Sequence, residues 1–159
     1  MKIVTRLNNF FDEELRSDVK DILITRDSTG RYTLFGEYSI TPNKGNFTVR
    51  GKNTKEVFAT IKNALAYVTL HNARKYSEAR RIQQLDLSLC SVNVELAVHR
   101  NILKNKTDYD SRLIYIIKIQ EDTIKKRRIV EEIKSHINNS IKIQTSKFAS
   151  VDRPKFVDR

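Results

Sequence analysis

The chain is 159 residues long, which is enough for one domain with a buried core. Its formal net charge of +11 favours contacts with polyanions, such as nucleic acid, acidic protein surfaces or anionic membranes. The single cysteine, Cys90, excludes an intrachain disulfide, and the chain shows neither a secretion signal nor an apolar run that could span a membrane. We therefore expect a protein that is not secreted and not embedded in a membrane.

Glycine and proline are concentrated near the start of the chain. All four glycines lie between Gly30 and Gly51, and after Pro42 the only proline is Pro154. Because these residues favour turns, a turn-rich segment is followed by a long segment typical of helices. The predicted fold class is α+β: a small N-terminal antiparallel β-meander, then a helix and a long antiparallel helical hairpin, and finally a flexible C-terminal tail.

The first 52 residues predict a short helix and three strands. Residues 7–16 place apolar side chains on one side of a helix. The β-prone segments that follow are bounded by turn residues, and Gly36 inside the second of them indicates a bulge. Because so few strands are barely stable alone, one face of the sheet should lie on the helices. The expected strands cover residues 22–25, 32–40 and 47–50, with turns at 27–30 and 41–46.

The first long helix is predicted to open at Asn53. Glu56 lies three residues further on and would complete a capping pair. Apolar residues at helical spacing over residues 57–68 line one face, which should cover the sheet and one side of the hairpin. Near residues 75–77 the pattern either breaks, with Ser77 as a new N-cap, or continues, and the sequence leaves both open.

Two heptad seams, joined by the polar segment 104–108, indicate the helical hairpin. The first seam is apolar except at His99, whereas the second carries polar residues at Thr123 and Lys126. The first consists of Ile82, Leu85, Leu89, Val92, Leu96, His99 and Leu103, and the second of Ile116, Ile119, Thr123, Lys126, Val130, Ile133 and Ile137.

The last helix is predicted over about residues 110–143 and changes character along its length. Its first half has two apolar rows, and this wide face should be buried in the domain. Its second half keeps one main row, a narrow face suited to a partner helix. The wide face comprises Leu113, Ile117 and Ile124 beside Ile116 and Ile119, and the narrow face comprises Val130, Ile133, Ile137 and Ile141.

The C-terminal segment 146–159 is predicted to be an extended tail. It contains a near repeat of Lys-Phe and Val-Asp-Arg and is too short and polar to fold alone, so we expect it to be flexible until it docks. The rest, 1–145, should form a single domain, with the β-meander and short helix in 1–52 and the helical part in 53–145. Within the tail the expected partner-binding residues are Phe148, Arg153, Phe156 and Arg159.

No motif in the chain predicts catalysis. His71, His99 and His136 lack the i, i+4 spacing of a helical metal site, and Cys90 has no cysteine nearby. Adjacent carboxylates on a helix diverge by about 100°, which makes them poor acid–base pairs. We therefore expect no catalytic, cofactor-binding or metal-ligating residues, and we interpret His99 as a satisfied core or interface histidine.

Basic residues offer an alternative function, because clustered lysines and arginines can contact phosphates. Most of these residues are expected at the surface, but Lys126 falls on the second seam. There Asp86 or Glu95 could face its charge. A solvated charged face is the competing interpretation. The candidate nucleic-acid residues are Arg74, Lys75, Arg80, Arg81, Lys125, Lys126, Arg127 and Arg128.

One short segment carries a resemblance. Residues 58–67 read Phe-Ala-Thr-Ile-Lys-Asn-Ala-Leu-Ala-Tyr, with Asn-Ala-Leu between two aromatic residues. After a β-meander and before paired basic helices, this resembles uncharacterised small basic proteins of tailed phages infecting marine cyanobacteria, with a shared layout over residues 20–140. The resemblance implies no activity and no site residue. It implies only a phage setting, with the protein in the host cytoplasm, the virion or both.

The leading hypothesis is a non-enzymatic structural, assembly or adaptor protein, as a phage virion or virion-assembly component. It would act through the hairpin and tail, with other protein subunits as partners, either further copies or virion proteins. The alternative is a nucleic-acid-binding protein that uses the basic helix faces. A third hypothesis is a phage-encoded inhibitor of a host protein, for which no residue is distinctive.

Overall fold

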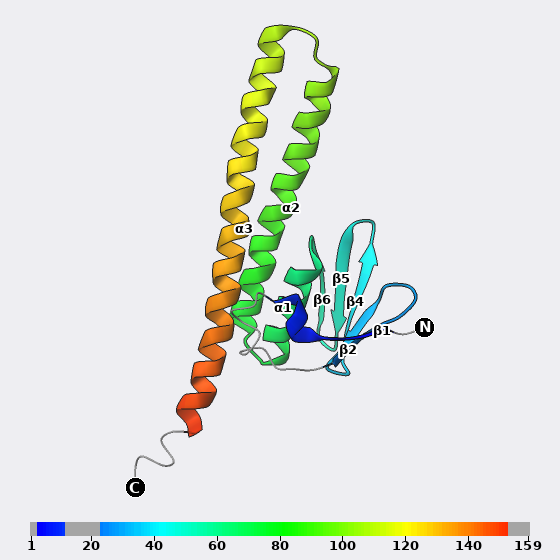
Figure 1. The fold of residues 1–159 in the computed structure, drawn as a ribbon, viewed down its shortest axis with the longest axis vertical. Helices are drawn as coiled ribbons and strands as arrows, with labels where there is room; N and C mark the ends of the chain where they lie inside the picture. The colour runs from blue at the N-terminus through cyan, green and yellow to red at the C-terminus, as the bar shows by residue number, and fades with distance from the viewer. Residues whose placement is uncertain (1–2, 12–22, 153–159) are drawn as a thin grey trace.

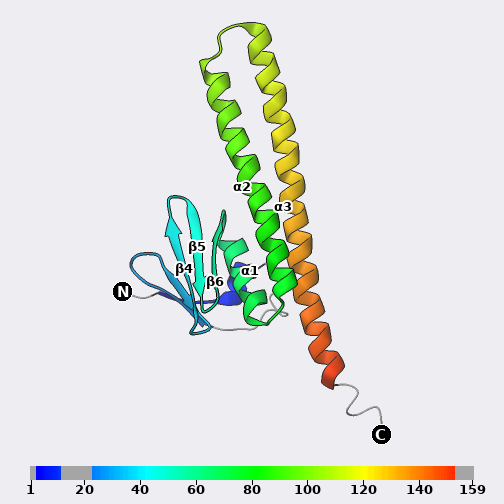
Figure 2. The ribbon, with the colours of Figure 1, turned by 180° about the vertical axis from the view of Figure 1, so that it is seen from behind.

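The computed structural model describes residues 3–11 and 23–152, without the side chains of Asn8, Leu23 and residues 142–152. The architecture is α+β, as the sequence predicts, with a sheet followed by three helices. Across the molecule lie the sheet, then helix α1 (Ile61–Asn72), then the hairpin of α2 (Tyr76–Asn105) and α3 (Tyr109–Asp152), as Figure 1 shows. The hairpin projects well beyond the sheet, which the view from behind confirms (Figure 2).

The sheet has six antiparallel strands in the order of the sequence, so it is a meander. Before the second strand, the segment Leu7–Phe10 forms a short 3-10 helix, η1. Residues 12–16 of the predicted short helix lie outside the described residues. The strands are β1 (Ile3–Arg6), β2 (Leu23–Arg26), β3 (Tyr32–Leu34), β4 (Tyr38–Asn43), β5 (Asn46–Gly51) and β6 (Thr54–Phe58).

The prediction of three strands was too low, because it lacked β1, joined β3 and β4 into one strand, and assigned β6 to a helix start. Phe35 and Gly36 both adopt positive φ, at 55° and 73°, so the segment taken as one bulged strand is the β3–β4 hairpin. The segment predicted to open the first helix forms β6 instead, paired with β5. Gly51 ends β5 where the Tyr38 ring packs so closely that a Cβ atom would lie 2.8 Å from it.

Helix α1 begins at Ile61, and its N-cap is Thr60 rather than Asn53. The Thr60 hydroxyl oxygen accepts a hydrogen bond from the Asn63 backbone N–H at 3.1 Å. Residues 63–70 of the helix are all buried, because α1 lies between the sheet and the hairpin. A helix that is apolar on every side is stable only in such a position.

The helical conformation is interrupted between α1 and α2, so of the two alternatives for residues 75–77 the break is the correct one. Arg74 adopts a positive φ of 63°, and α2 begins at Tyr76. The N-cap is Lys75, without a side-chain hydrogen bond, and Ser77 lies inside the helix. The joint therefore depends on one left-handed residue rather than on a capping side chain.

The predicted α2 seam is confirmed. Ile82, Leu85, Leu89, Val92 and Leu96 are all buried, and His99 and Leu103 are half-buried. The connection to α3 is shorter than predicted, since Lys104 and Asn105 belong to α2. Arg112 closes this turn, because its Nη1 donates to the carbonyls of Leu103 at 3.2 Å and Lys106 at 2.9 Å.

The α3 seam is rotated from the predicted one. Ile119, Lys126 and Ile133 face inward as expected, but Ile116 and Val130 are exposed. The two candidate seams differ by one residue at alternate positions, and both have heptad spacing. The observed seam buries Asp122, which pairs with His99 across the hairpin, and Ile129. The seam on α3 comprises Tyr115, Ile119, Asp122, Lys126, Ile129 and Ile133.

Helix α3 continues to Asp152, past the predicted end near residue 143. No glycine or proline occurs between Gly51 and Pro154, and a proline disfavours a helical conformation for the residue before it. The first part of the predicted tail is therefore helical. Arg153, Phe156 and Arg159 lie outside the described residues, and the Phe148 side chain is not described.

Candidate functional site

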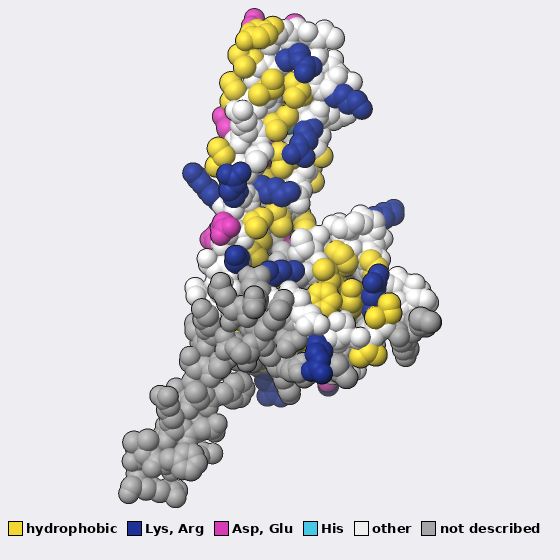
Figure 3. Space-filling view, viewed as in Figure 1, with side chains coloured by type: hydrophobic (Ala, Val, Ile, Leu, Met, Phe, Trp, Pro, Cys, Tyr) yellow, Lys and Arg dark blue, Asp and Glu magenta, His cyan; other side chains and the backbone are white. Residues whose placement is uncertain are grey.

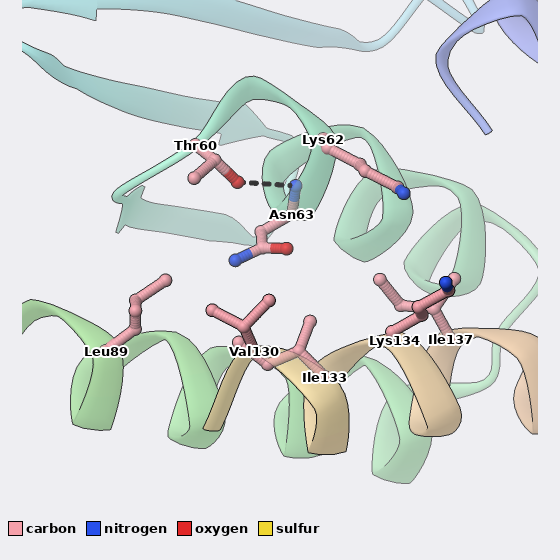
Figure 4. Close-up of a pocket in the computed structure, with 8 residues that line it drawn as sticks. All are labelled: Thr60, Lys62, Asn63, Leu89, Val130, Ile133, Lys134 and Ile137. Atoms are coloured by element: carbon pink, nitrogen blue, oxygen red, sulfur yellow. Dashed lines mark hydrogen bonds between the residues drawn. The ribbon is translucent and has the colours of Figure 1, made fainter. Parts of the chain in front are cut away.

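A hollow lies where the start of α1 meets the hairpin, with a volume of about 220 Å³. Figure 4 shows Asn63 pointing from α1 toward the hairpin, with the ends of Lys62 and Lys134 on one side. The hollow is lined by Thr60, Lys62, Asn63, Leu89, Val130, Ile133, Lys134 and Ile137.

The polar groups of this hollow already have partners. Thr60 caps α1, and the Asn63 Nδ2 donates to the Asp86 Oδ1 at 2.8 Å. Lys62 and Lys134 each take part in further interactions. The rest of the lining is mainly apolar and comes from Leu89, Val130, Ile133 and Ile137. The hollow is therefore a gap between packed layers rather than a binding site with directed polar groups.

Asp86 on α2 is a fully buried carboxylate with a structural role. Its two oxygens accept the Ala59 backbone N–H at 3.1 and 2.9 Å, which ties the β6–α1 connection to α2. Burial raises the pKa of Asp86, and the hydrogen bond from Asn63 opposes that shift. Burial, followed by the charge of Asp86, raises the pKa of the nearby Cys90 thiol, so Cys90 is not an activated nucleophile.

An aromatic cluster joins the sheet to the end of α1. The Tyr38 hydroxyl and the His71 Nδ1 are 2.7 Å apart, and the Tyr67 ring stacks on the imidazole with centroids 5.5 Å apart. Burial lowers the pKa of His71 and raises the pKa of Tyr38, so both groups favour their neutral forms. This cluster explains the His71 position by packing.

The other two histidines also have internal partners. The His99 Nδ1 lies 2.5 Å from the Asp122 Oδ2 inside the hairpin seam, and the His136 Nε2 lies 2.9 Å from the Glu78 carbonyl oxygen. His99 is therefore a satisfied interface histidine, as the sequence predicts. Within the described part of the chain, no group of three or more His, Cys, Asp or Glu side chains could hold a metal ion.

The predicted partner face on the second half of α3 is largely buried inside the protein. Ile133, Ile137 and Ile141 are 5%, 2% and 2% exposed, because α1 and α2 cover them. Val130 is 43% exposed and lies at the rim of the hollow. The expectation that this row is open to a partner is therefore wrong for its three isoleucines.

The basic residues predicted for nucleic-acid contact are spread over the α1–α2 joint, α2 and α3. Arg81 Nη2 pairs with the Glu132 Oε1 at 2.9 Å, and Lys126 is half-buried in the hairpin seam. Asp86, one of the acids expected to face Lys126, bonds Ala59 and Asn63 instead. Figure 3 shows Lys and Arg side chains dispersed along the hairpin, with apolar side chains between them. Arg74, Lys75, Arg80, Lys125, Arg127 and Arg128 lie partly or fully exposed on the α1–α2 joint, α2 and α3.

A row of exposed apolar side chains lies on the first half of α3, in addition to the exposed Leu87, Val94 and Val98 on α2. Helical spacing from the buried seam places a second row on the opposite side of the helix, away from α2. We call this the outward row. Leu113, Ile117 and Ile124 within it are 42%, 46% and 50% exposed, and Ile114 and Ile116 flank them at 53% and 38%. The outward row comprises Asp110, Leu113, Ile117, Gln120, Ile124, Arg127 and Glu131, all exposed.

The apolar row that forms this surface is visible in the sequence, but the prediction that it lies inside the domain is wrong. Leu113, Ile117 and Ile124 were recognised as one apolar row, but we expected the domain to bury them. The body of the protein packs against the other half of the hairpin, so the row has no cover from the described residues. Whether this row is buried or exposed depends on where α1 and the sheet dock on the hairpin. The periodicity of apolar residues in α3 contains no information about that position.

Comparison with known proteins adds no relative: no family model, no curated protein and no solved structure matches this chain. Within the described residues, no helix is long and apolar enough to cross a membrane.

Proposed function

We propose that this chain is a non-enzymatic structural or assembly protein that binds other protein subunits through the outward row. The observation that carries the proposal is the exposure of Leu113, Ile117 and Ile124 at regular spacing on a projecting helix. Single exposed apolar residues are ordinary, whereas a contiguous apolar surface is typical of a protein contact. A role in a phage particle or its assembly rests on the resemblance of residues 58–67 alone.

The experiment compares three forms of the purified, tagged chain incubated with extract from its native source. They are the wild type, Ile117→Asp in the outward row, and Leu87→Asp, which is a matched control because Leu87 is a 55% exposed apolar residue on α2. A charge placed at an apolar contact should lower the recovery of partner proteins at least tenfold, since burying an unpaired carboxylate is costly. Mass spectrometry of the recovered proteins measures this.

Equal recovery by Ile117→Asp and wild type would contradict the proposal. Recovery that disappears after nuclease treatment would favour the nucleic-acid alternative, because its basic residues would then make the contact through phosphates. Far-UV circular dichroism confirms that both variants are folded. Mass spectrometry of purified particles tests the virion setting separately, and absence of the chain from particles would remove that part of the proposal.

A further inference from the structure

Building on the proposed function, on which the following depends, we propose that the outward row binds the outward row of a second copy of this chain. The two α3 helices would lie antiparallel around a two-fold axis, in the middle of a row of four helices with one α2 helix on each outer side. Such an interface is isologous, which means that each pair of facing residues occurs twice. The outward row must therefore be complementary to the same row running in the opposite direction.

The order of charges along the row meets this requirement. The row begins with an acid, Asp110, and continues past its apolar residues to a base, Arg127. When two copies run antiparallel with Leu113 facing Ile124, Asp110 of each copy faces Arg127 of the other. The contact between these two charged positions is about 25 Å long, at 1.5 Å per residue. Exposed Ile114 and Ile116 lie beside it and widen the apolar surface.

Other arrangements of the same helices are less favourable. A parallel pair would place Asp110 against Asp110 and Arg127 against Arg127. Shifting the antiparallel pair by one heptad in one direction places Arg127 against Ile117 and Glu131 against Leu113. A shift in the other direction moves Ile124 past the start of the facing helix. Only the register with Asp110 facing Arg127 pairs opposite charges and keeps Leu113 and Ile124 in contact.

The shape of the molecule leaves room for this arrangement. In both ribbon views α3 is the element farthest from the sheet, with α2 between them (Figures 1 and 2). The part of α3 that packs on the body, from Ile129 onward, would lie beyond the start of the partner's α3, because Arg127 already faces Asp110 near that start. The two bodies would therefore occupy opposite ends of the dimer and would not collide.

The experiment uses the purified chain alone and measures its mass by light scattering between about 1 and 100 µM. Asp110→Arg and Arg127→Asp each create like-charge pairs at both ends of the interface. Each should raise the Kd of the dimer about tenfold, since an exposed charge pair contributes up to about 1 kcal/mol and each change affects two pairs. Lys125→Asp makes the same kind of charge change on an exposed position outside the row and should leave the Kd unchanged.

Mixing the two single variants is the decisive step. The arginine introduced at position 110 of one variant then faces the aspartate introduced at position 127 of the other, and the unaltered Arg127 and Asp110 face each other at the opposite end. The mixture should therefore dimerise with about the wild-type Kd, although each variant alone dimerises more weakly. Because both variants must be folded to do this, rescue also excludes a mere loss of the helix start at Asp110, which lies in the first turn of α3.

A wild-type chain that stays monomeric at 100 µM would overturn the inference, as would single variants that dimerise as well as the wild type or a mixture that shows no rescue. These failures can be separated from failure of the proposed function. If the wild type is monomeric but Ile117→Asp still loses its captured proteins, the partner is a different protein and the proposed function stands. If neither dimerisation nor capture depends on the row, both fail.

Discussion

At the scale of single residues, some of the buried polar groups connect layers of this protein. Asp86 illustrates this, because its carboxylate holds the β6–α1 connection through the Ala59 N–H and holds α1 through Asn63. No periodic pattern distinguishes it from a surface acid of α2, yet it is fully buried. A buried carboxylate without a cation is tolerated only when hydrogen bonds satisfy its oxygens.

We expect Asp86→Ala to lower the free energy of unfolding by about 2–4 kcal/mol. The substitution leaves the buried donors of Ala59 and Asn63 without an acceptor, and each unsatisfied group costs about 1–3 kcal/mol. Urea denaturation followed by circular dichroism measures this change. Ser88→Ala, at an exposed position of the same helix, is the control and should change stability by less than about 0.5 kcal/mol.

The same residue should make stability depend on pH in a definite direction. Burial raises the pKa of Asp86, so the folded chain keeps this proton to higher pH than the unfolded chain, whose pKa is near 3.8. The proton therefore stabilises the fold fully below pH 3.8, and this contribution is lost as pH rises through the folded pKa. The stability of the wild type minus that of Asp86→Asn should fall over that range. A difference that rises with pH would contradict this reasoning.

At the scale of elements, α3 has several apolar rows and buries one of them against α2. Rows beginning at Tyr115 and at Ile116 both have heptad spacing, so the rotation of the helix is not determined by α3 alone. The fixed α2 seam contains His99, and the rotation that brings Asp122 to it gives the imidazole a partner at 2.5 Å. This polar pair fits the register that the two long helices adopt, and buried polar groups can favour one register in coiled coils.

Substitutions at Ile133 and Val130 should report this rotation directly. Ile133→Ala removes a 5% exposed side chain and should lower the free energy of unfolding by about 2–4 kcal/mol. Val130→Ala affects a 43% exposed side chain and should change it by less than about 1 kcal/mol. Chemical denaturation of both variants provides the comparison. Similar losses at the two positions would mean that α3 buries the other row.

At the scale of the whole molecule, stability should be unequal along the hairpin. Near the body, α2 and α3 are covered by α1, which is itself buried over residues 63–70. Beyond the body, each helix has only the other as a neighbour among the described elements, and much of the apolar surface of α3 is exposed. Fewer buried contacts mean that local opening costs less free energy.

The rate of amide hydrogen exchange should therefore differ along the chain, and the difference should depend on protein concentration. In dilute protein we expect the slowest amide exchange in residues 64–70 of α1 and faster exchange in α2 after His99 and in α3 before Ile119, because only the former are packed on both sides. At high concentration the second copy should slow exchange in the early turns of α3. Mass-spectrometric exchange at two concentrations tests this, and uniform protection along the hairpin in dilute protein would contradict it.

The sequence by itself determined the α+β class, the early position of the sheet and the α2 seam from Ile82 to Leu103. Those features follow from local causes, namely the concentration of glycine before residue 52 and the regular spacing of apolar residues. It did not determine the six-strand count, because Asn53 and Glu56 also fit a helix cap, whereas the structure pairs residues 54–58 with β5.

Only the tertiary structure decided which apolar row of α3 is buried and which is exposed. The narrow row at Ile133, Ile137 and Ile141 was expected to meet a partner and is interior, whereas the row through Leu113, Ile117 and Ile124 was expected to be interior and is exposed. Both rows satisfy the same periodicity. Their exposure depends on where α1 docks along the hairpin, and that position is set by contacts between segments far apart in the chain, such as Ala59 with Asp86.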